Sequence, residues 1–316
     1  MTVSIIVAVK GDNPNLRECI EHCLKLDYPD FEILVLPDNQ INSYYPKTRV
    51  IPTGELTPPQ KRDMALDAAR GEILAFLDDD AYPLNDWLNK AVKHFANPEI
   101  AAVGGPAVTP DSDSMRQKAS GLVYGSLLVS GPYVYRYLPG KERLVDDFPS
   151  CNFLVRKSVM QEIGGFDTKF WPGEDTFLCL KIIKDLRKKI IYDPAVLAFH
   201  HRRSLFGGHL KQIANYAMHR GYFVKRFPKN SFKPAYFLPS VLVLGLTAGL
   251  TFSFIYPPLK APYLSGLVFY LAIVFIFSIR IDFRLTFLVF WGIIFSHLTY
   301  GLYFIRGLMS RKLKEE

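Results

Sequence analysis

Three apolar runs near the end of the chain restrict its possible folds more than any other feature. Ala235–Tyr256, Ala261–Ile279 and Leu285–Ile305 are largely apolar, and each has about 20 residues, the length that crosses a bilayer. A soluble core rarely needs three such runs in succession. The sequence therefore predicts about three transmembrane helices within residues 235–307. The residues before them, in a chain of 316, are enough for one large separate domain.

The charged residues around these runs leave two topologies open. Because no basic region precedes the short apolar run Val3–Val9, we predict no signal peptide and expect the N-terminal domain in the cytoplasm. Three spans would place the loop Arg280–Arg284 inside but the basic tail 308–316 outside, against the tendency of Lys and Arg to stay inside. Three spans are the first prediction. The alternative is that one segment is re-entrant or interfacial, which leaves both termini inside.

A basic segment comes just before the apolar runs. Residues 194–231 contain seven basic residues and no acidic ones. Within 204–234 these alternate with aromatic and aliphatic residues, which predicts an amphipathic helix on an anionic membrane surface. The alternative is an ordinary surface helix packed on the preceding domain. Nucleic acid is not expected as a partner, because no recognition motif accompanies the charge.

Short apolar runs and helical periodicity alternate through the first 200 residues. The predicted strands are Val3–Val9, Phe31–Leu36, Arg49–Ile51, Ile73–Leu77, Ile100–Gly105, Ile190–Tyr192 and Val196–Phe199. This alternation predicts an α/β domain with a mostly parallel, doubly wound sheet. Cys19 and Cys23 stand one helical turn apart, which fits burial on one helix face better than a metal site. The segment Ser130–Asp147 fits either a mobile loop near an acceptor or an ordinary surface loop.

Three consecutive carboxylates follow one of these strands. Ile73–Leu77 runs directly into Asp78, Asp79 and Asp80, and open α/β sheets hold ligands at the carboxyl ends of their strands. Adjacent carboxylates repel one another, and a hard divalent cation such as Mg²⁺ or Mn²⁺ relieves that repulsion. The pattern therefore predicts a metal site. The alternative is a solvated acidic turn.

A second acidic pair follows a loop rich in Gly, Pro and Trp. Glu174 and Asp175 precede the periodic segment Thr176–Lys184, so they lie at a predicted helix N-terminus, where the helix dipole stabilises carboxylates. Capping alone would explain Glu174. The adjacent Asp175 favours a functional site.

Four motifs follow one another along the chain: Pro37-Asp38-Asn39, Asp78-Asp79-Asp80, Gly164-Gly165-Phe166-Asp167 and Glu174-Asp175. Together and in this order they resemble the family 2 glycosyltransferases of the GT-A fold. The resemblance covers roughly residues 2–205, so residues 1–203 are predicted as a GT-A domain. The later segments look like those of membrane-bound members that build exopolysaccharides or glycolipids. The resemblance implies inverting transfer of a hexosyl-type sugar from a nucleotide-diphosphate sugar to a lipid-linked acceptor at the cell membrane.

The resemblance also assigns roles by position. Asp38 resembles the acid that contacts the nucleotide base, and Asp175 the general base, with Glu174 beside it on the acceptor side. His200, or the adjacent His201, resembles a histidine that completes the metal site. The implied donor-binding residues are Lys10, Asp38, Arg62, Asp63, Asp78 and Asp79, and the implied metal ligands are Asp78, Asp80 and His200.

Some positions depart from the family pattern. Pro37 stands where many members have a second acid, and Lys10 where a small or hydroxyl residue is common, so base contacts are expected to differ. No Gln-x-x-Arg-Trp follows Asp175, which favours single additions over processive synthesis. Two other functions stay open: a nucleotidyltransferase, and a membrane protein that binds sugar nucleotides without turnover.

Overall fold

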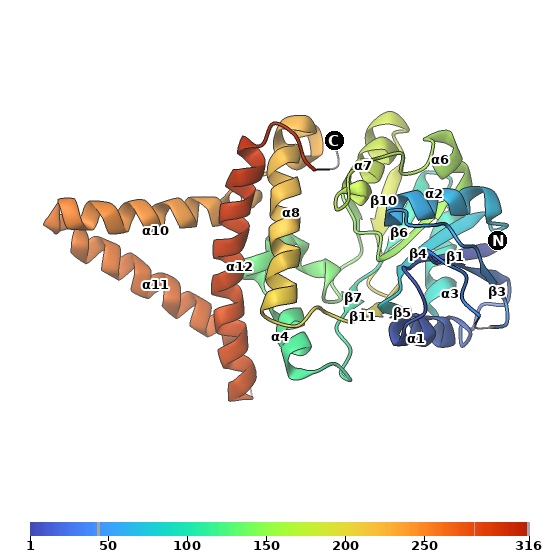
Figure 1. Cartoon of the computed structure of the whole chain (residues 1–316), viewed down its shortest axis with the longest axis horizontal. Coiled ribbons are helices and arrows are strands. Elements are labelled where there is room, and N and C mark those ends of the chain that lie inside the picture. The colour runs from blue at the N-terminus through green and yellow to red at the C-terminus, as the bar shows by residue number, and fades with distance from the viewer. Residues whose placement is uncertain (43–44, 281, 315–316) are drawn as a thin grey trace. The chain divides into compact units, whose positions relative to one another are not determined.

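The computed structural model describes residues 1–42, 45–280 and 282–314. Glu315 and Glu316 of the predicted basic tail lie outside the described residues. The chain forms two compact units. The first contains residues 1–110 and 135–201, and the second contains residues 111–134 and 202–314. Figure 1 shows the elements of both.

The first unit contains an eight-stranded sheet. Its strands, in spatial order, are β3 (Thr48–Val50), β2 (Phe31–Leu36), β1 (Val3–Ala8), β4 (Ile73–Asp78), β9 (Asn152–Arg156), β6 (Ile100–Gly104), β10 (Lys189–Tyr192) and β8 (Arg143–Val145). Strands β3, β2, β1 and β4 are parallel neighbours. The predicted mostly parallel α/β domain is thus confirmed. The antiparallel strand β9 between β4 and β6, and the antiparallel edge strand β8, were not predicted.

Helices accompany this sheet in chain order. They are α1 (Pro14–Cys23), α2 (Pro58–Ala68), α3 (Trp87–Val92), α6 (Lys157–Glu162) and α7 (Glu174–Leu180), with short helical turns η1 (Lys93–Ala96) and η3 (Lys181–Asp185). A further turn, η2 (Gly131–Arg136), includes the residues at which the chain passes from the second unit back to the first. Cys19 and Cys23 of α1 are buried free thiols, as their spacing predicted. They belong to a core that also contains the alternate side chains Val3, Ile5 and Val7 of β1. The same core contains Ile73, Ala75 and Leu77 of β4, and it therefore fixes the strand that ends at Asp78.

A second sheet, of three strands, includes the residues that directly follow Asp78, Asp79 and Asp80 in the chain. It pairs β5 (Ala81–Pro83) with β11 (Ala198–His200), and β11 with β7 (Ala107–Val108). Ala81, immediately after the acidic triplet, is the register partner of His200. A strand pairing thus brings residues more than a hundred positions apart in the chain next to one another.

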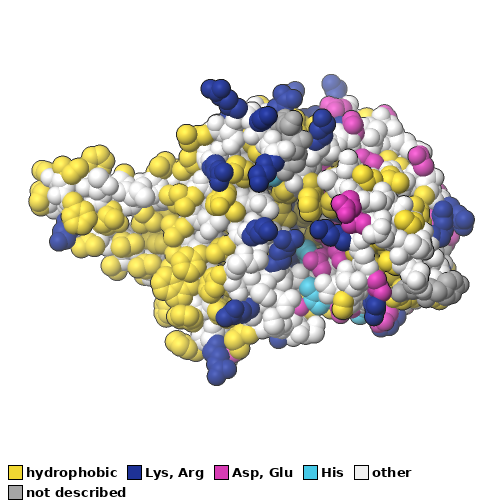
Figure 2. Space-filling model, in the orientation of Figure 1, with side chains coloured by type: hydrophobic (Ala, Val, Ile, Leu, Met, Phe, Trp, Pro, Cys, Tyr) yellow, Lys and Arg dark blue, Asp and Glu magenta, His cyan; other side chains and the backbone are white. Residues whose placement is uncertain are grey.

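The second unit is helical. It contains α4 (Met115–Tyr124), α5 (Leu127–Ser130), α8 (Gly207–Arg226), α9 (Pro228–Ser231), η4 (Pro234–Tyr236), α10 (Leu238–Ile255), η5 (Pro257–Leu259), α11 (Lys260–Ser278) and α12 (Phe283–Met309). Three of its helical segments, Leu238–Ile255, Pro257–Ser278 and Phe283–Met309, are long and apolar enough to cross a membrane. Figure 2 shows hydrophobic side chains over much of the surface of α10 and α11.

Helix α4 joins this helical unit although it lies inside the predicted 1–203 domain. Ala119 and Val123 of α4 belong to one hydrophobic cluster with Leu205 and with Val289 and Ile293 of α12. Residues 111–134 therefore pack with the C-terminal helices.

Candidate active site

The end of β4 and the end of β11 form a cluster of possible metal ligands. Ligand atoms of Asp78, Asp80 and His200 all lie within 4.8 Å of one another, and His200 Nε2 is 3.0 Å from Asp80 Oδ1. The backbone N–H of His201 donates to the Asp80 carbonyl (2.9 Å), which fixes the turn. The two carboxylates are oxygen ligands suited to Mn²⁺ or Mg²⁺, and the imidazole adds a nitrogen ligand.

His201, the alternative metal ligand, contacts a different partner. Its Nε2 lies 2.9 Å from Glu18 Oε2 on α1. The group of Asp78, Asp80 and His200 does not include it. Of the two histidines, His200 is therefore the one whose position suits the predicted metal site.

The middle acid, Asp79, is held by α1. Asn13 Nδ2 donates to Asp79 Oδ2 (2.8 Å), while Asn13 Oδ1 accepts from Leu16 N and caps the helix. Burial raises the pKa of Asp79 to about 6 against the effect of the Asn13 hydrogen bond, and the nearby Asp80 and Asp78 carboxylates also raise it. Like charges crowd this turn, which is the condition that a divalent cation relieves.

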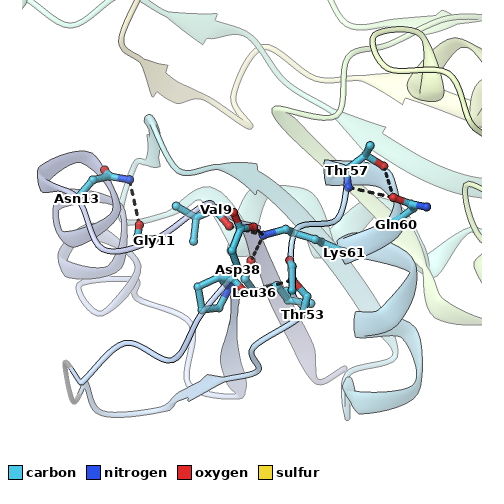
Figure 3. Close-up of polar contacts among 11 residues, drawn as sticks. Val9, Gly11, Asn13, Leu36, Asp38, Thr53, Thr57, Gln60 and Lys61 are labelled. Carbon is cyan, nitrogen blue, oxygen red and sulfur yellow. Dashed lines mark hydrogen bonds and ion pairs between the residues drawn. The ribbon is translucent and has the colours of Figure 1, made fainter. Parts of the chain in front are cut away.

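A buried lysine organises the ends of β1 and β2. Lys61, on α2, is 2% exposed. Its Nζ donates to the carbonyls of Val9 (2.6 Å) and Leu36 (3.2 Å) and to the carboxylate of Asp38 (Figure 3). Lys61 was not among the predicted site residues, because a lysine in a helix usually faces solvent.

The two predicted donor residues of this corner differ in exposure. Lys10 is exposed, and its carbonyl accepts from the Asp38 backbone N–H (3.0 Å). The Asp38 side chain is 18% exposed and is already paired with Lys61. The Thr53 hydroxyl donates to the neighbouring Pro37 carbonyl (3.1 Å) and ties the following loop to the end of β2. Contacts of Lys10 and Asp38 with a nucleotide stay predictions.

Arg62 connects the two acidic motifs of the sequence. This buried side chain donates from Nη2 to Asp78 Oδ1 (2.7 Å) and from Nη1 to Glu174 Oε1 (3.1 Å) and Ser150 Oγ (2.9 Å). Asp78 ends β4, whereas Glu174 begins α7. Acids almost a hundred positions apart therefore contact one guanidinium group.

The first turn of α7 holds the predicted catalytic pair. Gly173 precedes it with φ 116°, a conformation that favours glycine, and donates its N–H to Glu174 Oε2 (3.0 Å). Asp175 Oδ1 accepts from Thr176 N (2.8 Å). Burial and, next, the neighbouring Asp175 raise the pKa of Glu174 to about 7, against the effect of Arg62.

The carboxylate of Asp63 accepts hydrogen bonds from a loop of the first unit. Its Oδ1 accepts from Phe166 N (2.7 Å) and its Oδ2 from Asp167 N (3.1 Å). The Gly164–Asp167 motif is therefore held against α2. These bonds give Asp63 a structural role, and its predicted donor contact stays a prediction.

Asp147 is a further buried acid that the sequence did not single out. Its Oδ1 accepts from Thr176 Oγ1 (3.0 Å), and Arg136 Nη2 lies 3.6 Å from its Oδ2. Asp147 thus anchors the start of α7. An acidic pair, Asp146-Asp147, at the end of the 130–147 segment was the available sequence signal.

A second possible metal group stands apart from these residues. Ligand atoms of His94, Glu142 and Asp193 lie within 4.8 Å of one another. Asp193 Oδ2, however, already contacts His94 Nε2 (2.7 Å) and Lys93 Nζ (3.3 Å). Because the Lys93 ammonium group is already paired with that oxygen, it would compete with a metal ion there. We therefore interpret this cluster as a structural ion-pair network.

Curated proteins of similar sequence include glycosyltransferases. The pre-mycofactocin glycosyltransferase of Mycobacterium tuberculosis is 30% identical over 147 residues, which cover 46% of this chain and 30% of that protein. The glucosyl-dolichyl phosphate glucuronosyltransferase of Haloferax volcanii is 24% identical over 147 residues, covering 44% of this chain and 46% of that protein. The chain thus spans less than half the length of these relatives.

The fold also matches solved glycosyltransferases. Mannosyltransferase PcManGT from Pyrobaculum calidifontis, solved with GDP-Man and Mn²⁺, aligns over 98% of this chain and 88% of its own, with a TM-score of 0.65 and 18% identity. This likeness shows the GT-A fold. The family model described as glycosyl transferase family 2 matches residues 4–164, about half of the chain. The chain therefore belongs to glycosyl transferase family 2.

Proposed function

We propose that this glycosyltransferase moves one sugar at a time from a nucleotide-diphosphate sugar to a lipid-linked acceptor at a membrane, with inversion at the anomeric carbon. The observation that supports the site best is the double contact of Arg62 with Asp78 and Glu174. It joins the proposed donor side of the site to the proposed acceptor side. Lys10, Asp38, Asp63 and Asp79 complete the proposed donor-binding set.

Asp78, Asp80 and His200 are the proposed ligands of Mg²⁺ or Mn²⁺. Their ligand atoms converge within 4.8 Å, and the two carboxylates are oxygen ligands of the kind that both ions prefer. When bound there, the cation would offset the negative charge of the nucleotide-diphosphate leaving group. The Mn²⁺ held by the similarly folded PcManGT with GDP-Man supports this proposal.

Asp175 is the proposed general base. An acceptor hydroxyl must lose its proton as it attacks the anomeric carbon, and a carboxylate within reach can accept it. The Thr176 N–H fixes one oxygen of Asp175 (2.8 Å), while Arg62 and Gly173 orient the adjacent Glu174. A single base on the face opposite the leaving group gives inversion and needs no covalent nucleophile.

The proposed acceptor is lipid-linked. Three helices of this chain are long and apolar enough to cross a membrane, which would keep the enzyme where such acceptors are dissolved. The name of the Haloferax volcanii relative, which refers to a glucosyl-dolichyl phosphate, supports the same class. We place the catalytic unit on the cytoplasmic side of a multi-pass cell-membrane protein.

The test is transfer by the full chain in membranes. Membranes are incubated with labelled UDP-, GDP- and dTDP-sugars and Mn²⁺, with and without a chelator, and the lipid extract is assayed for label. We expect one donor to label the lipid fraction and the chelator to abolish it. Product with retained anomeric configuration, or transfer unaffected by the chelator, would contradict inversion or metal dependence, respectively.

An Asp175→Asn variant tests the base. We expect it to lose transfer by at least about a hundredfold, the scale of general base catalysis, while it still binds the nucleotide. Asp185→Asn is the control, since Asp185 is an exposed acid in the turn that follows α7. Unchanged turnover in Asp175→Asn would remove Asp175 from the mechanism.

A further inference from the structure

The last apolar helix, α12, differs from the other two in how much of it is covered by protein. In α12, 44% of the membrane-length window is buried, against 17% for α10 and 11% for the segment containing α11. Helix α8 covers one side of α12. His209 Nε2 lies 2.9 Å from Ser296 Oγ, and Lys225 Nζ donates to the Ser310 carbonyl (2.6 Å). Helix α8 therefore accompanies α12 over its second half.

Close backbone packing joins these two helices. A Cβ on Gly221 of α8 would lie 2.2 Å from the Phe304 carbonyl oxygen, and one on Gly307 of α12 would lie 2.0 Å from that of Met218. Figure 1 shows α8 and α12 side by side, whereas α10 and α11 project away from them. Helices α8 and α12 are therefore packed against each other with their backbones in close contact.

The α10–α11 hairpin contacts α12 through the start of α10 and the end of α11. These two ends lie away from the turn of the hairpin. At the beginning of α10, Ser240 Oγ donates to the Gly301 carbonyl (3.0 Å). Just after the end of α11, Arg280 N donates to Thr286 Oγ1 (2.9 Å). The hairpin turn lies at Tyr256–Leu259, between the two helices. The start of α10 and the end of α11 must lie on the same side of a bilayer that both helices cross.

These contacts conflict with a third crossing by α12. Its 27 residues span about 40 Å, so crossing would carry Gly301 and Ser310 toward the far surface. Ser240, at the near end of α10, and Lys225, which precedes α10 in the chain, contact those two residues. Among the described residues between 202 and 237, no helix is long and apolar enough to cross. Crossing by α12 would also carry the charged helix α8 into the hydrocarbon, at about 3 kcal/mol per charge at the bilayer centre.

The exposed side of α12 has the composition expected at a membrane surface. One stripe of large apolar residues, spaced by four and then by seven positions, remains exposed: Phe283, Phe287, Trp291, Phe295, Leu302 and Met309. We call it the α12 apolar stripe. Basic residues follow at both ends, with Arg280 and Arg284 at the start and Arg306 and Arg311 near the finish. Between residues 234 and 279, by contrast, Lys260 at the hairpin turn is the one charged residue.

We propose that α10 and α11 cross the bilayer as a hairpin, while α12 lies in the membrane surface with the α12 apolar stripe in the lipid. Of the two topologies that the sequence leaves open, this is the interfacial one. The basic ends of α12 lie at the anionic head groups, on the side from which α10 enters. The C-terminal residues then lie on the same side as the catalytic unit, and the Lys and Arg distribution follows the positive-inside tendency.

Cysteine labelling in sealed, uniformly oriented membrane vesicles tests the topology. Lys312→Cys, Pro258→Cys and Lys90→Cys report the tail, the hairpin turn and the catalytic unit. The parent chain is measured in parallel because native Cys151 is partly exposed. We expect an impermeant maleimide to label positions 312 and 90 from one side and position 258 from the other. Labelling of 312 and 258 from the same side would overturn the proposal.

Spin-label depth measurements on the full chain in vesicles test the orientation of α12 separately. Nitroxides are attached at Phe287→Cys, Phe295→Cys and Leu302→Cys, which span about 22 Å of helix. We expect the three labels to report equal, shallow depths from the ratio of oxygen to nickel-chelate accessibility. A label at 295 markedly deeper than those at 287 and 302 would show that α12 crosses. Both measurements are independent of sugar transfer, so they stand whether or not the proposed function does.

Discussion

Lys61 directs its ammonium group at the carboxylate of Asp38, at the point where β1 and β2 end. The same group donates to the Val9 and Leu36 carbonyls, so each of its three hydrogens has an acceptor. A buried ammonium group is tolerated only when it is paired in this way. The ion pair therefore fixes the orientation of the acid proposed to contact the nucleotide base.

Replacing Lys61 by Met should destabilise the catalytic unit. The change leaves two carbonyls and a partly buried carboxylate without their donor, and breaking a buried pair costs about 3–5 kcal/mol. Thermal unfolding of the purified chain measures the effect. Lys90→Met is the control, because Lys90 makes an exposed ion pair with Asp86, worth about 0.2–1 kcal/mol. Equal losses in the two variants would contradict a special role for Lys61.

Replacing Arg62 by Lys should reduce turnover. Arg62 uses two guanidinium nitrogens to contact Asp78, Glu174 and Ser150. The single ammonium group of a lysine cannot occupy both positions, so it loses at least one of these hydrogen bonds. Losing a hydrogen bond between charged groups costs about 1.5–3 kcal/mol, which corresponds to roughly ten- to a hundredfold in rate. Steady-state kinetics should show the fall in kcat. Arg49→Lys, at a partly exposed pair with Glu32, should leave kcat unchanged.

Replacing His200 by Ala should weaken Mn²⁺ binding, and replacing His201 should not. His200 belongs to the group of converging ligand atoms, whereas His201 pairs with Glu18. We expect the Mn²⁺ dissociation constant to rise by at least about tenfold, the smaller of the losses seen when only a residue that orients a metal ligand is changed. Calorimetric titration of Mn²⁺ into each variant checks it. Similar affinities in the two variants would argue that His200 is not a ligand.

Glu174 should make the stability of the metal-free protein fall as pH rises. Its pKa is raised to about 7 from an ordinary 4.5, so the folded state binds the proton more tightly than the unfolded one. The stabilising contribution is complete below about pH 4.5 and is lost as pH rises through about 7. Melting temperatures measured from pH 4.5 to 8 check this.

Glu174→Gln is the diagnostic variant for that pH dependence. It should flatten the decline only in part, because the pKa of Asp79 is also raised, to about 6, in the same range. An unaltered pH profile in Glu174→Gln would mean that Glu174 titrates near its ordinary value.

The sequence predicted those features that depend on local pattern. Strands β1 and β4 coincide with the mostly apolar runs Val3–Val9 and Ile73–Leu77 from which they were predicted. Such signals act within a few residues and need no knowledge of the whole fold. The mostly parallel sheet followed from their alternation.

The sequence did not predict what depends on distant partners. The antiparallel direction of β9 is set by its neighbours β4 and β6, and no local pattern encodes it. The burial of Lys61 depends on carbonyls contributed by two strands. The partial burial of α12 depends on distant partners too, because α8 and α4 cover one side of it.

The packing of Ala119 and Val123 against α12 determines where this enzyme can be truncated. A shortened version that stops after residue 203 would keep α4 but lose every C-terminal helix on which it rests. The apolar face of α4 would then be exposed to water and would promote aggregation. A soluble version needs 111–134 replaced by a short polar linker as well as the end removed.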